Sequence, residues 1–344
     1  MKSPQCPAIT ALMKVTTAIP RTTRNRDIAL GALFALAIAA GLVMLARGTG
    51  WSEVVNQIAR LGAVQIAVLL VLSLANYGCR ALRWHVCVRR AGLDLPLSSS
   101  LRHFLGGFAM SVTPGRVGEL VRLRWIGRET GAAMTRIAPL ALLDRAADLG
   151  AMALILAVSL ALAQAGIAGG MLAAGGALAL AFIVTRPGLF AAAALGAYRA
   201  TGRFARPLAR LRSAAGLLGR FQAPRVAVPV LALGIVGWAA EGIGLWLLLG
   251  WFGAPVGFWA AIAIFTFATL AGGLTGAPGG LGGAEAAMVA LLVASDVPLD
   301  AAIAATAVIR LTTLWFALAI GLVVFPVAER HATRCERDHA LENR

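Results

Sequence analysis

The chain has 344 residues, of which 59% are hydrophobic and only 13% are charged, and its mean hydropathy is +0.81. Soluble domains carry about 25% charged residues, so this composition excludes an ordinary soluble protein and predicts an integral membrane protein. The net charge of +16 would suit nucleic acid. The basic residues lie between the apolar segments, however, so we expect no nucleic acid among the partners.

Six apolar stretches are long enough to cross a bilayer as helices. They cover residues 28–46, 61–79, 137–165, 168–184, 226–250 and 301–325. The basic first 27 residues precede an apolar stretch longer than the core of a signal peptide, which we interpret as a retained first span. The sequence thus predicts a basic N-terminal segment (1–27), a transmembrane domain (28–325) and a polar, cytoplasmic tail (326–344).

Two further apolar pieces are interrupted by Pro-Gly. The first, residues 103–113, ends at TPGRVGE, and the second, residues 258–275, ends at APGGLGGAE before an apolar stretch at 284–294. Proline removes a helical N–H and glycine accepts unusual dihedral angles, so both motifs predict a break in a helix. We expect each piece to form a re-entrant, broken helical hairpin.

The distribution of basic residues predicts the orientation. Of the 31 Lys and Arg residues, 27 lie in four segments, residues 1–27, 80–136, 186–225 and 326–344. We therefore expect these segments, and both termini, on the cytoplasmic side of the inner (plasma) membrane. The arginine-rich loops there are expected to contact anionic lipid.

The order span, span, hairpin, span occurs twice, over residues 28–165 and 168–325. The second copy starts on the opposite side of the membrane, so the pattern predicts an inverted-topology repeat. Transporters commonly use such repeats to build a site at the bilayer midplane. The expected fold class is therefore an all-α membrane protein with about six full spans and two broken hairpins.

The two hairpins carry the same polar residues at matched spacing. Each has Pro-Gly, a second Gly and a Glu, and an intramembrane Arg follows the Glu by 26 residues in the first copy and 25 in the second. A helix N-terminus at the break suits an anion, and arginine binds phosphate through two parallel hydrogen bonds. The arginines are also the expected counter-charges of the buried glutamates. The candidate substrate-binding residues are Pro114, Gly115, Gly118, Glu119 and Arg145 in the first copy, and Pro278, Gly279, Gly282, Glu285 and Arg310 in the second.

These features also have plainer interpretations. Glycines permit close helix packing and Glu–Arg pairs can be structural, although the duplication favours a shared function. Asp144 and Asp148 lie four residues apart and could hold a metal, but ion pairs with Arg122 or Arg145 are the better explanation. The cysteines and histidines lack metal-ligand spacing, so we expect no metal or other cofactor. Glu241, alone in the fifth span, is either an ion-coupling site or a hydrogen-bonded packing residue.

Five segments occur in the order typical of the lysylphosphatidylglycerol synthase transmembrane (flippase-like) family, which this chain resembles over residues 28–325. They are RALRW, PGRVGELVR, LLDRAADL, PGGLGGAE and AVIRLTTLW. The resemblance implies an inner-membrane protein that moves a lipid or lipid-linked headgroup between leaflets. It adds Arg80, Arg122 and Asp148 to the candidate substrate-binding residues. Where family members often have a glutamate before the arginine of the third segment, this chain has Asp144.

Two other functions remain open. One is a membrane-embedded transferase that acts on a lipid carrier, and the other is a non-transporting partner of envelope glycosyltransferases. The sequence has no P-loop motif, and the aminoacyl-transferase domain of bifunctional family members is not part of it, so we expect no enzymatic activity. A lipid-modifying enzyme encoded nearby is an expected partner, and its type would indicate which lipid is handled.

The orientation can be tested by thiol labelling. A single cysteine at position 212, in a variant without the four native cysteines, should react with an impermeant reagent only after cells are permeabilised, because segment 186–225 is expected in the cytoplasm. A cysteine at position 296, expected outside, is the control that should react in intact cells. Rapid labelling of position 212 in intact cells would contradict the orientation.

Overall fold

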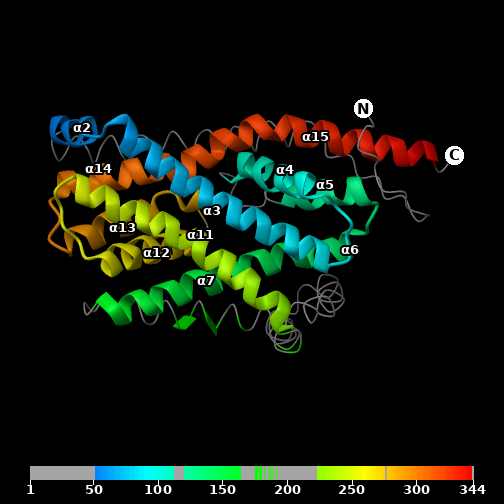
Figure 1. Cartoon of the computed structure of the whole chain (residues 1–344), viewed down its shortest axis with the longest axis horizontal. Coiled ribbons are helices and arrows are strands. Elements are labelled where there is room, and N and C mark those ends of the chain that lie inside the picture. The colour runs from blue at the N-terminus through cyan, green and yellow to red at the C-terminus, as the bar shows by residue number, and fades with distance from the viewer. Residues whose placement is uncertain are drawn as a thin grey trace, which may run out of the picture.

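The computed structural model describes residues 51–111, 120–163, 223–275 and 277–342, together with eight isolated positions between 175 and 192. All the regular structure in these ranges is helical (Figure 1). The expected span at 28–46, most of the one at 168–184 and the loop 112–119 lie outside the described residues.

Four long apolar helices dominate the described part of the chain. They are α3 (Ala63–Arg90), α6 with α7 (Met134–Ile137 and Pro139–Ala163), α11 (Pro224–Trp251) and α14 with α15 (Leu299–Arg310 and Phe316–Glu342). A 28-residue helix such as α3 is about 42 Å long, which exceeds the ~30 Å hydrocarbon core of a bilayer. These helices confirm the expected class, an all-helical, multi-pass membrane protein. A short helix, α2 (Trp51–Ala59), precedes them.

The second predicted helix break is found where the sequence places it. Helix α12 (Phe258–Leu274) and helix α13 (Gly283–Val293) pack against each other around a 3₁₀ turn at Pro278–Gly280. Gly279, Gly280 and Gly282 have φ of 63°, 70° and 82°, a region that residues with a side chain rarely adopt. In the other hairpin, α4 (Leu97–Gly107) leads into a 3₁₀ turn at Phe108–Met110, and α5 (Val121–Thr130) follows the loop.

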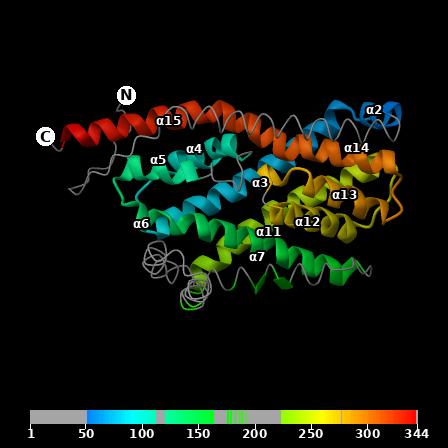
Figure 2. The ribbon, with the colours of Figure 1, turned by 180° about the vertical axis from the view of Figure 1, so that it is seen from behind.

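The helices are arranged around a central pair. Helices α3 and α11 pack along each other in the middle of the molecule (Figure 1). Helix α7 packs along α12, and α15 packs along α4 and α5 (Figure 2). The first and second parts of the sequence are therefore interleaved, since α7 and α15 each pack on a hairpin from the other part.

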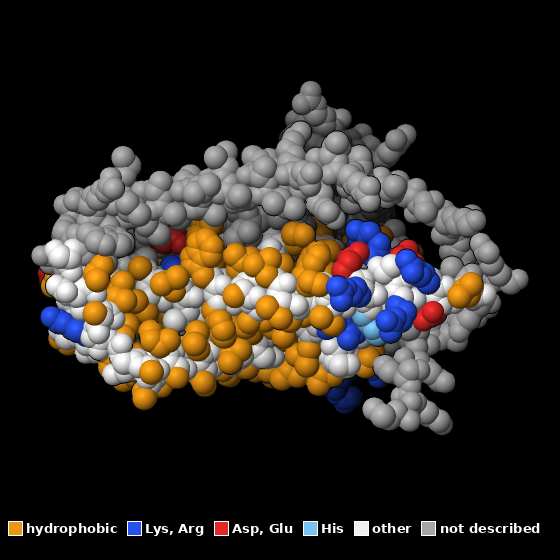
Figure 3. Space-filling model, turned by 90° about the horizontal axis from the view of Figure 1, so that it is seen from above, with side chains coloured by type: hydrophobic (Ala, Val, Ile, Leu, Met, Phe, Trp, Pro, Cys, Tyr) orange, Lys and Arg blue, Asp and Glu red, His pale blue; other side chains and the backbone are white. Residues whose placement is uncertain are grey.

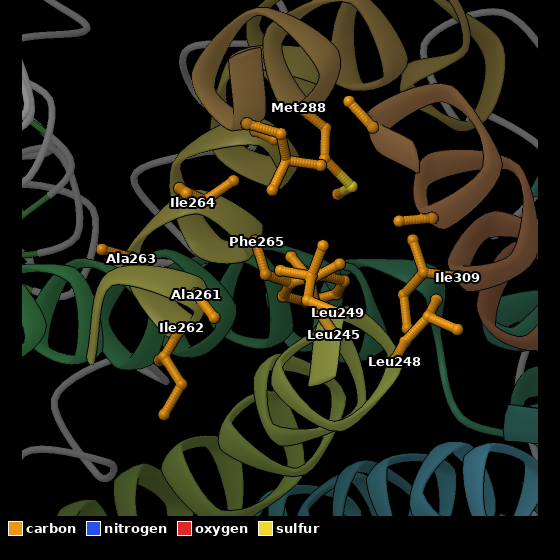
Figure 4. Close-up of a cluster of buried hydrophobic side chains, with 14 of the residues drawn as sticks. Leu245, Leu248, Leu249, Ala261, Ile262, Ala263, Ile264, Phe265, Met288 and Ile309 are labelled. Atoms are coloured by element: carbon orange, nitrogen blue, oxygen red, sulfur yellow. The ribbon is translucent and has the colours of Figure 1, made fainter. Parts of the chain in front are cut away.

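Two apolar cores hold this arrangement together. One lies between α11, α12, α13 and α14, where Leu245, Phe265, Met288 and Ile309 converge (Figure 4). The second is built on α3, α4, α5 and α7 and contains large side chains such as Trp84. Because lipid tails are as apolar as these side chains, the cores stabilise the bundle through close van der Waals packing and not through exclusion of water.

The outer surface matches a lipid environment. Val64 and Val71 on α3 and Leu322 and Val323 on α15 are 60–75% exposed. Figure 3 shows a broad band of hydrophobic side chains, with Lys, Arg, Asp and Glu gathered mainly at one end of the molecule. A contiguous apolar band of this kind is unfavourable in water and favourable against acyl chains.

The segment after residue 325 is not an independent tail in this structure. Helix α15 continues through Pro326 to Glu342. Glu329 accepts hydrogen bonds of 2.7 Å from both Trp125 Nε1 and Arg128 Nη1, and Arg128 also pairs with Glu336 at 3.0 Å. These contacts with α5 stabilise the part of α15 that extends beyond the apolar stretch ending at residue 325.

A close helix approach predicts one sensitive glycine. A Cβ at Gly321 of α15 would collide with the backbone of Phe108 and Ala109. Gly321→Ala should therefore lower the unfolding free energy by about 1–3 kcal/mol, measured from thermal unfolding in detergent. Gly273→Ala in α12, where the added Cβ meets nothing within 4 Å, is the control and should not destabilise the protein. Equal stability of the two variants would contradict the packing of α15 on the first hairpin.

Candidate functional site

A polar cavity of about 70 Å³ lies among the central helices. Its charged lining residues are Arg80 from α3, Glu241 from α11 and Arg310 from α14. Its other lining residues are Tyr77, Phe108, Ser111, Trp238, Phe265, Thr269, Gly279, Thr313, Leu314 and Ala317. Charged side chains inside an apolar bundle are costly to bury, so this cavity is the candidate functional site.

Arg80 connects the cavity to a buried cluster of charges. Its Nη2 donates to Asp148 at 2.9 Å, and its guanidinium lies 4.7 Å from the centre of the Trp238 ring. Trp238 Nε1 in turn donates to Asp148 at 3.0 Å. Arg80, Trp238 and Asp148 come from α3, α11 and α7, so their contacts fix three helices beside the cavity.

Arg83, one helical turn after Arg80, is the centre of this charge cluster. Its side chain is fully buried, and its Nη2 donates to Asp144 at 2.6 Å and to Asp148 at 2.7 Å. Gly234 of α11 leaves room for it, because a Cβ there would lie 3.2 Å from Arg83 Nη1. The sequence-based interpretation assigned Arg83 only to a positively charged region after the second span. It could have been recognised from its i, i+3 spacing to Arg80.

Arg122 and Arg145 complete the charge cluster. Arg145 lies 3.1 Å from Asp144 and 3.3 Å from Asp148, and Arg122 lies 3.5 Å from Asp144. Arg122 also packs over the rings of Trp84 and Phe104. Both aspartates therefore form the ion pairs that the sequence suggested in place of a metal site. Four arginines share two aspartates, so the cluster of these described residues carries a surplus of two positive charges.

The predicted pair of Glu285 and Arg310 forms at the second helix break. Arg310 Nε donates to Glu285 Oε1 at 2.5 Å, and Arg310 Nη2 donates to the carbonyl of Gly279 at 3.0 Å. Glu285 Oε2 accepts from the backbone N–H of Gly282 at 2.6 Å. The carboxylate therefore occupies the N-terminus of α13, where the sequence suggested an external anion, and Arg310 holds the break in place.

Glu241 differs from the other buried carboxylates. It is only 5% exposed and lines the cavity, yet within the described residues it makes no hydrogen bond and no ion pair. The charges that act on it most strongly are those of Arg80, Arg310 and Asp148. The alternative interpretation of Glu241 as a hydrogen-bonded packing residue therefore has no support among these contacts.

A local change of helix type shapes the floor of the cavity. Residues Leu311–Trp315 form a π-helical turn between Arg310 and α15, and the Tyr77 hydroxyl donates to the carbonyl of Thr313. Such turns widen a helix by one residue and are frequent at functional sites. Here the turn brings Thr313 and Leu314 to the cavity beside Arg310.

The structure brings some of the predicted site residues together and separates others. Arg80, Gly279 and Arg310 line the cavity, and Asp148 and Glu285 anchor these two arginines. Arg122 and Arg145 belong to the charge cluster and are not among the cavity-lining residues, so Arg80, and not Arg145, shares the cavity with Arg310. Pro278 and Gly282 belong to the helix break. Pro114, Gly115, Gly118 and Glu119 lie outside the described residues.

The fold and the buried charges define the class as a multi-pass helical membrane protein with a polar intramembrane cavity. Residues 32–321 match the model of the lysylphosphatidylglycerol synthase TM region, so the chain belongs to that family. It is also 34% identical over 94 residues to a UPF0104 membrane protein from Methanothermobacter thermautotrophicus. That match covers 27% of this chain and 28% of the relative.

The burial of Arg83 predicts an unequal effect of two arginine substitutions. Arg83→Ala should lower the unfolding free energy by about 3–5 kcal/mol, because it removes a fully buried partner of both aspartates. Arg145→Ala removes a partner of the same aspartates, but its side chain is 33% exposed, and we expect a loss of about 1 kcal/mol. Denaturant unfolding in detergent measures both. Equal losses would contradict the central place of Arg83 in the cluster.

Proposed function

We propose that the protein moves a lipid with an anionic headgroup across the membrane, and that the headgroup binds in the cavity between Arg80 and Arg310. The observation that carries this proposal is that two arginines from different halves of the sequence, the buried Arg80 and the partly buried Arg310, line one cavity. A phosphate is the anionic group of most lipid headgroups, and guanidinium groups bind it through paired hydrogen bonds.

The hydrogen bonding of the two arginines supports this role. Arg80 and Arg310 are each tethered by a carboxylate, Asp148 and Glu285, at 2.9 and 2.5 Å. Within the described residues, Nη1 of neither arginine has a hydrogen-bond partner. Each guanidinium therefore keeps a fixed position and a spare donor, which is the arrangement a transiently bound anion requires.

The size of the cavity suits a headgroup and not a whole lipid. A site for one water needs about 10–15 Å³ on the same measure, so about 70 Å³ holds a group of a few water-sized units. The acyl chains would then remain outside the bundle, where the exposed side chains are apolar.

A constant spacing between the first residues of corresponding helices supports the inverted-topology interpretation. Helices α3 and α11 begin at residues 63 and 224, and α4 and α12 begin at 97 and 258, so both pairs differ by 161 residues. The packing of α7 on α12 is matched by that of α15 on α4, as a pseudo-twofold axis requires.

The same 161-residue offset relates residues of the cavity lining. The related pairs are Tyr77 and Trp238, Arg80 and Glu241, and Phe108 and Thr269. A cavity lined by related positions from both halves would lie on the pseudo-twofold axis, where alternating-access transporters hold their substrate. We infer that rocking of the two halves about this axis exposes the headgroup to each leaflet in turn, with the basic loops and both termini in the cytoplasm.

A leaflet-resolved assay tests the proposal. Purified protein in proteoliposomes should move at least one anionic phospholipid from a panel of labelled lipids faster than protein-free liposomes. Failure with every phosphate-bearing lipid, including lipid-linked sugars, would favour the other two functions, a transferase or a non-transporting partner of envelope enzymes.

Arg310→Lys should reduce the rate of transport by about tenfold or more, with little change in expression. Lysine keeps the positive charge but loses the planar fork that contacts Glu285, Gly279 and the substrate together. The loss corresponds to one charge-assisted hydrogen bond, about 1.5–3 kcal/mol. Arg60→Lys, at an exposed arginine outside the cavity, is the matched control and should transport at the native rate. An unchanged rate in Arg310→Lys would contradict a role in headgroup binding.

A further inference from the structure

We propose that Glu241 is a proton-binding site, and that binding of an anionic headgroup in the cavity is coupled to the uptake of one proton by its carboxylate. This inference rests on the proposed function and adds the ion to which that function is linked. The coupling arises because Glu241, when ionised, and the headgroup phosphate are both anions attracted by the same two arginines.

The position of Glu241 makes it a competitor of the substrate. Its carboxylate lines the same cavity as Arg80 and Arg310, and these are the cations that act on it most strongly. When ionised, it neutralises part of the positive charge that would attract a phosphate. When Glu241 is protonated it is neutral, so the two arginines attract an anion more strongly.

Among the described residues, the surrounding helices offer Glu241 no other partner. The titratable and charged groups that face it are Tyr77 and Arg80 from α3, Asp148 from α7 and Arg310 from α14. Asp148 is held by Arg80 and Arg83, and Arg310 by Glu285 of α13. Helix α12 contributes Phe265 and Thr269, which do not titrate. Glu241 is therefore the carboxylate in the described part of the cavity that can gain a proton without breaking an ion pair.

The charge count gives the sign of the coupling. The described cluster and cavity contain five arginines, Arg80, Arg83, Arg122, Arg145 and Arg310, and four carboxylates, Asp144, Asp148, Glu241 and Glu285. Their net charge is +1 with Glu241 ionised and +2 with Glu241 protonated. Anion binding and proton binding therefore favour each other, and a headgroup that crosses with the proton leaves the site charge unchanged.

Binding of a short-chain phospholipid at several pH values tests this inference. The probe is dihexanoyl phosphatidylglycerol, a phosphodiester that keeps one negative charge over the whole pH range of the experiment. A phosphomonoester would be unsuitable, because its own second ionisation lies near pH 6. Its Kd for the purified protein should fall as the pH is lowered from 8 to 5, by up to about tenfold per pH unit, the limit for one proton taken up per ligand. Calorimetry in buffers of different ionisation enthalpy should show the same proton uptake directly.

Glu241→Gln should bind the probe tightly at every pH and take up no proton, because the amide imitates the protonated carboxylate. Asp296→Asn is the control, since Asp296 is an exposed carboxylate whose φ of 61° asparagine also tolerates. It should keep the native pH dependence.

Three results would overturn the inference, and they differ in whether the proposed function falls as well. If the native protein binds the probe with the same Kd at every pH, or if Glu241→Gln keeps the native slope, the proton linkage is wrong while the headgroup site stands. If the native protein binds no phosphodiester probe at any pH, the proposed function is wrong, and the linkage with it.

Discussion

The structure depends on how a membrane protein keeps several arginines charged inside an apolar bundle. A guanidinium cannot lose its proton under ordinary conditions, so each buried arginine must find carboxylates, carbonyls or aromatic faces. Asp144 and Asp148 on α7 supply these partners to α3, and Glu285 with the Gly279 carbonyl supplies them to Arg310. The helix packing and the position of the cavity both follow from these pairings.

The two halves solve this problem in different ways. In the first half, Arg80, Arg83, Arg122 and Arg145 pair with Asp144 and Asp148, and this charge cluster lies next to the cavity. In the second half, Arg310 and Glu285 neutralise each other and close the helix break. The position related to Arg80 is Glu241, so the cavity has a cation and an anion on opposite sides of the proposed axis. Such an asymmetric site is suited to an anion that arrives together with a proton.

Much of this could be predicted from the sequence, and the exceptions have a physical reason. Hydropathy and the Pro-Gly motifs are local signals, and they located α11, the break between α12 and α13, and the Glu285–Arg310 pair. The end of α3 was placed at residue 79 because charges normally mark the membrane surface, but Arg80 and Arg83 are buried by aspartates from a distant helix. Likewise, α15 continues past residue 325 because Trp125 and Arg128 bind Glu329, a contact that spans about 200 residues of sequence. Tertiary pairing decided both cases. The i, i+3 spacing of Arg80 and Arg83 places them on one helix face, but it does not reveal their partners on α7.

The central claim is that Arg80 and Arg310 hold one headgroup phosphate between the two halves. A cryo-EM structure of the protein in the presence of dihexanoyl phosphatidylglycerol tests this most directly. The account predicts phosphate density within hydrogen-bonding distance, about 2.7–3.2 Å, of both guanidinium groups, with the acyl chains leading toward the lipid-facing surface. Density only at arginines outside this cavity, with the cavity between Arg80 and Arg310 empty, would contradict it.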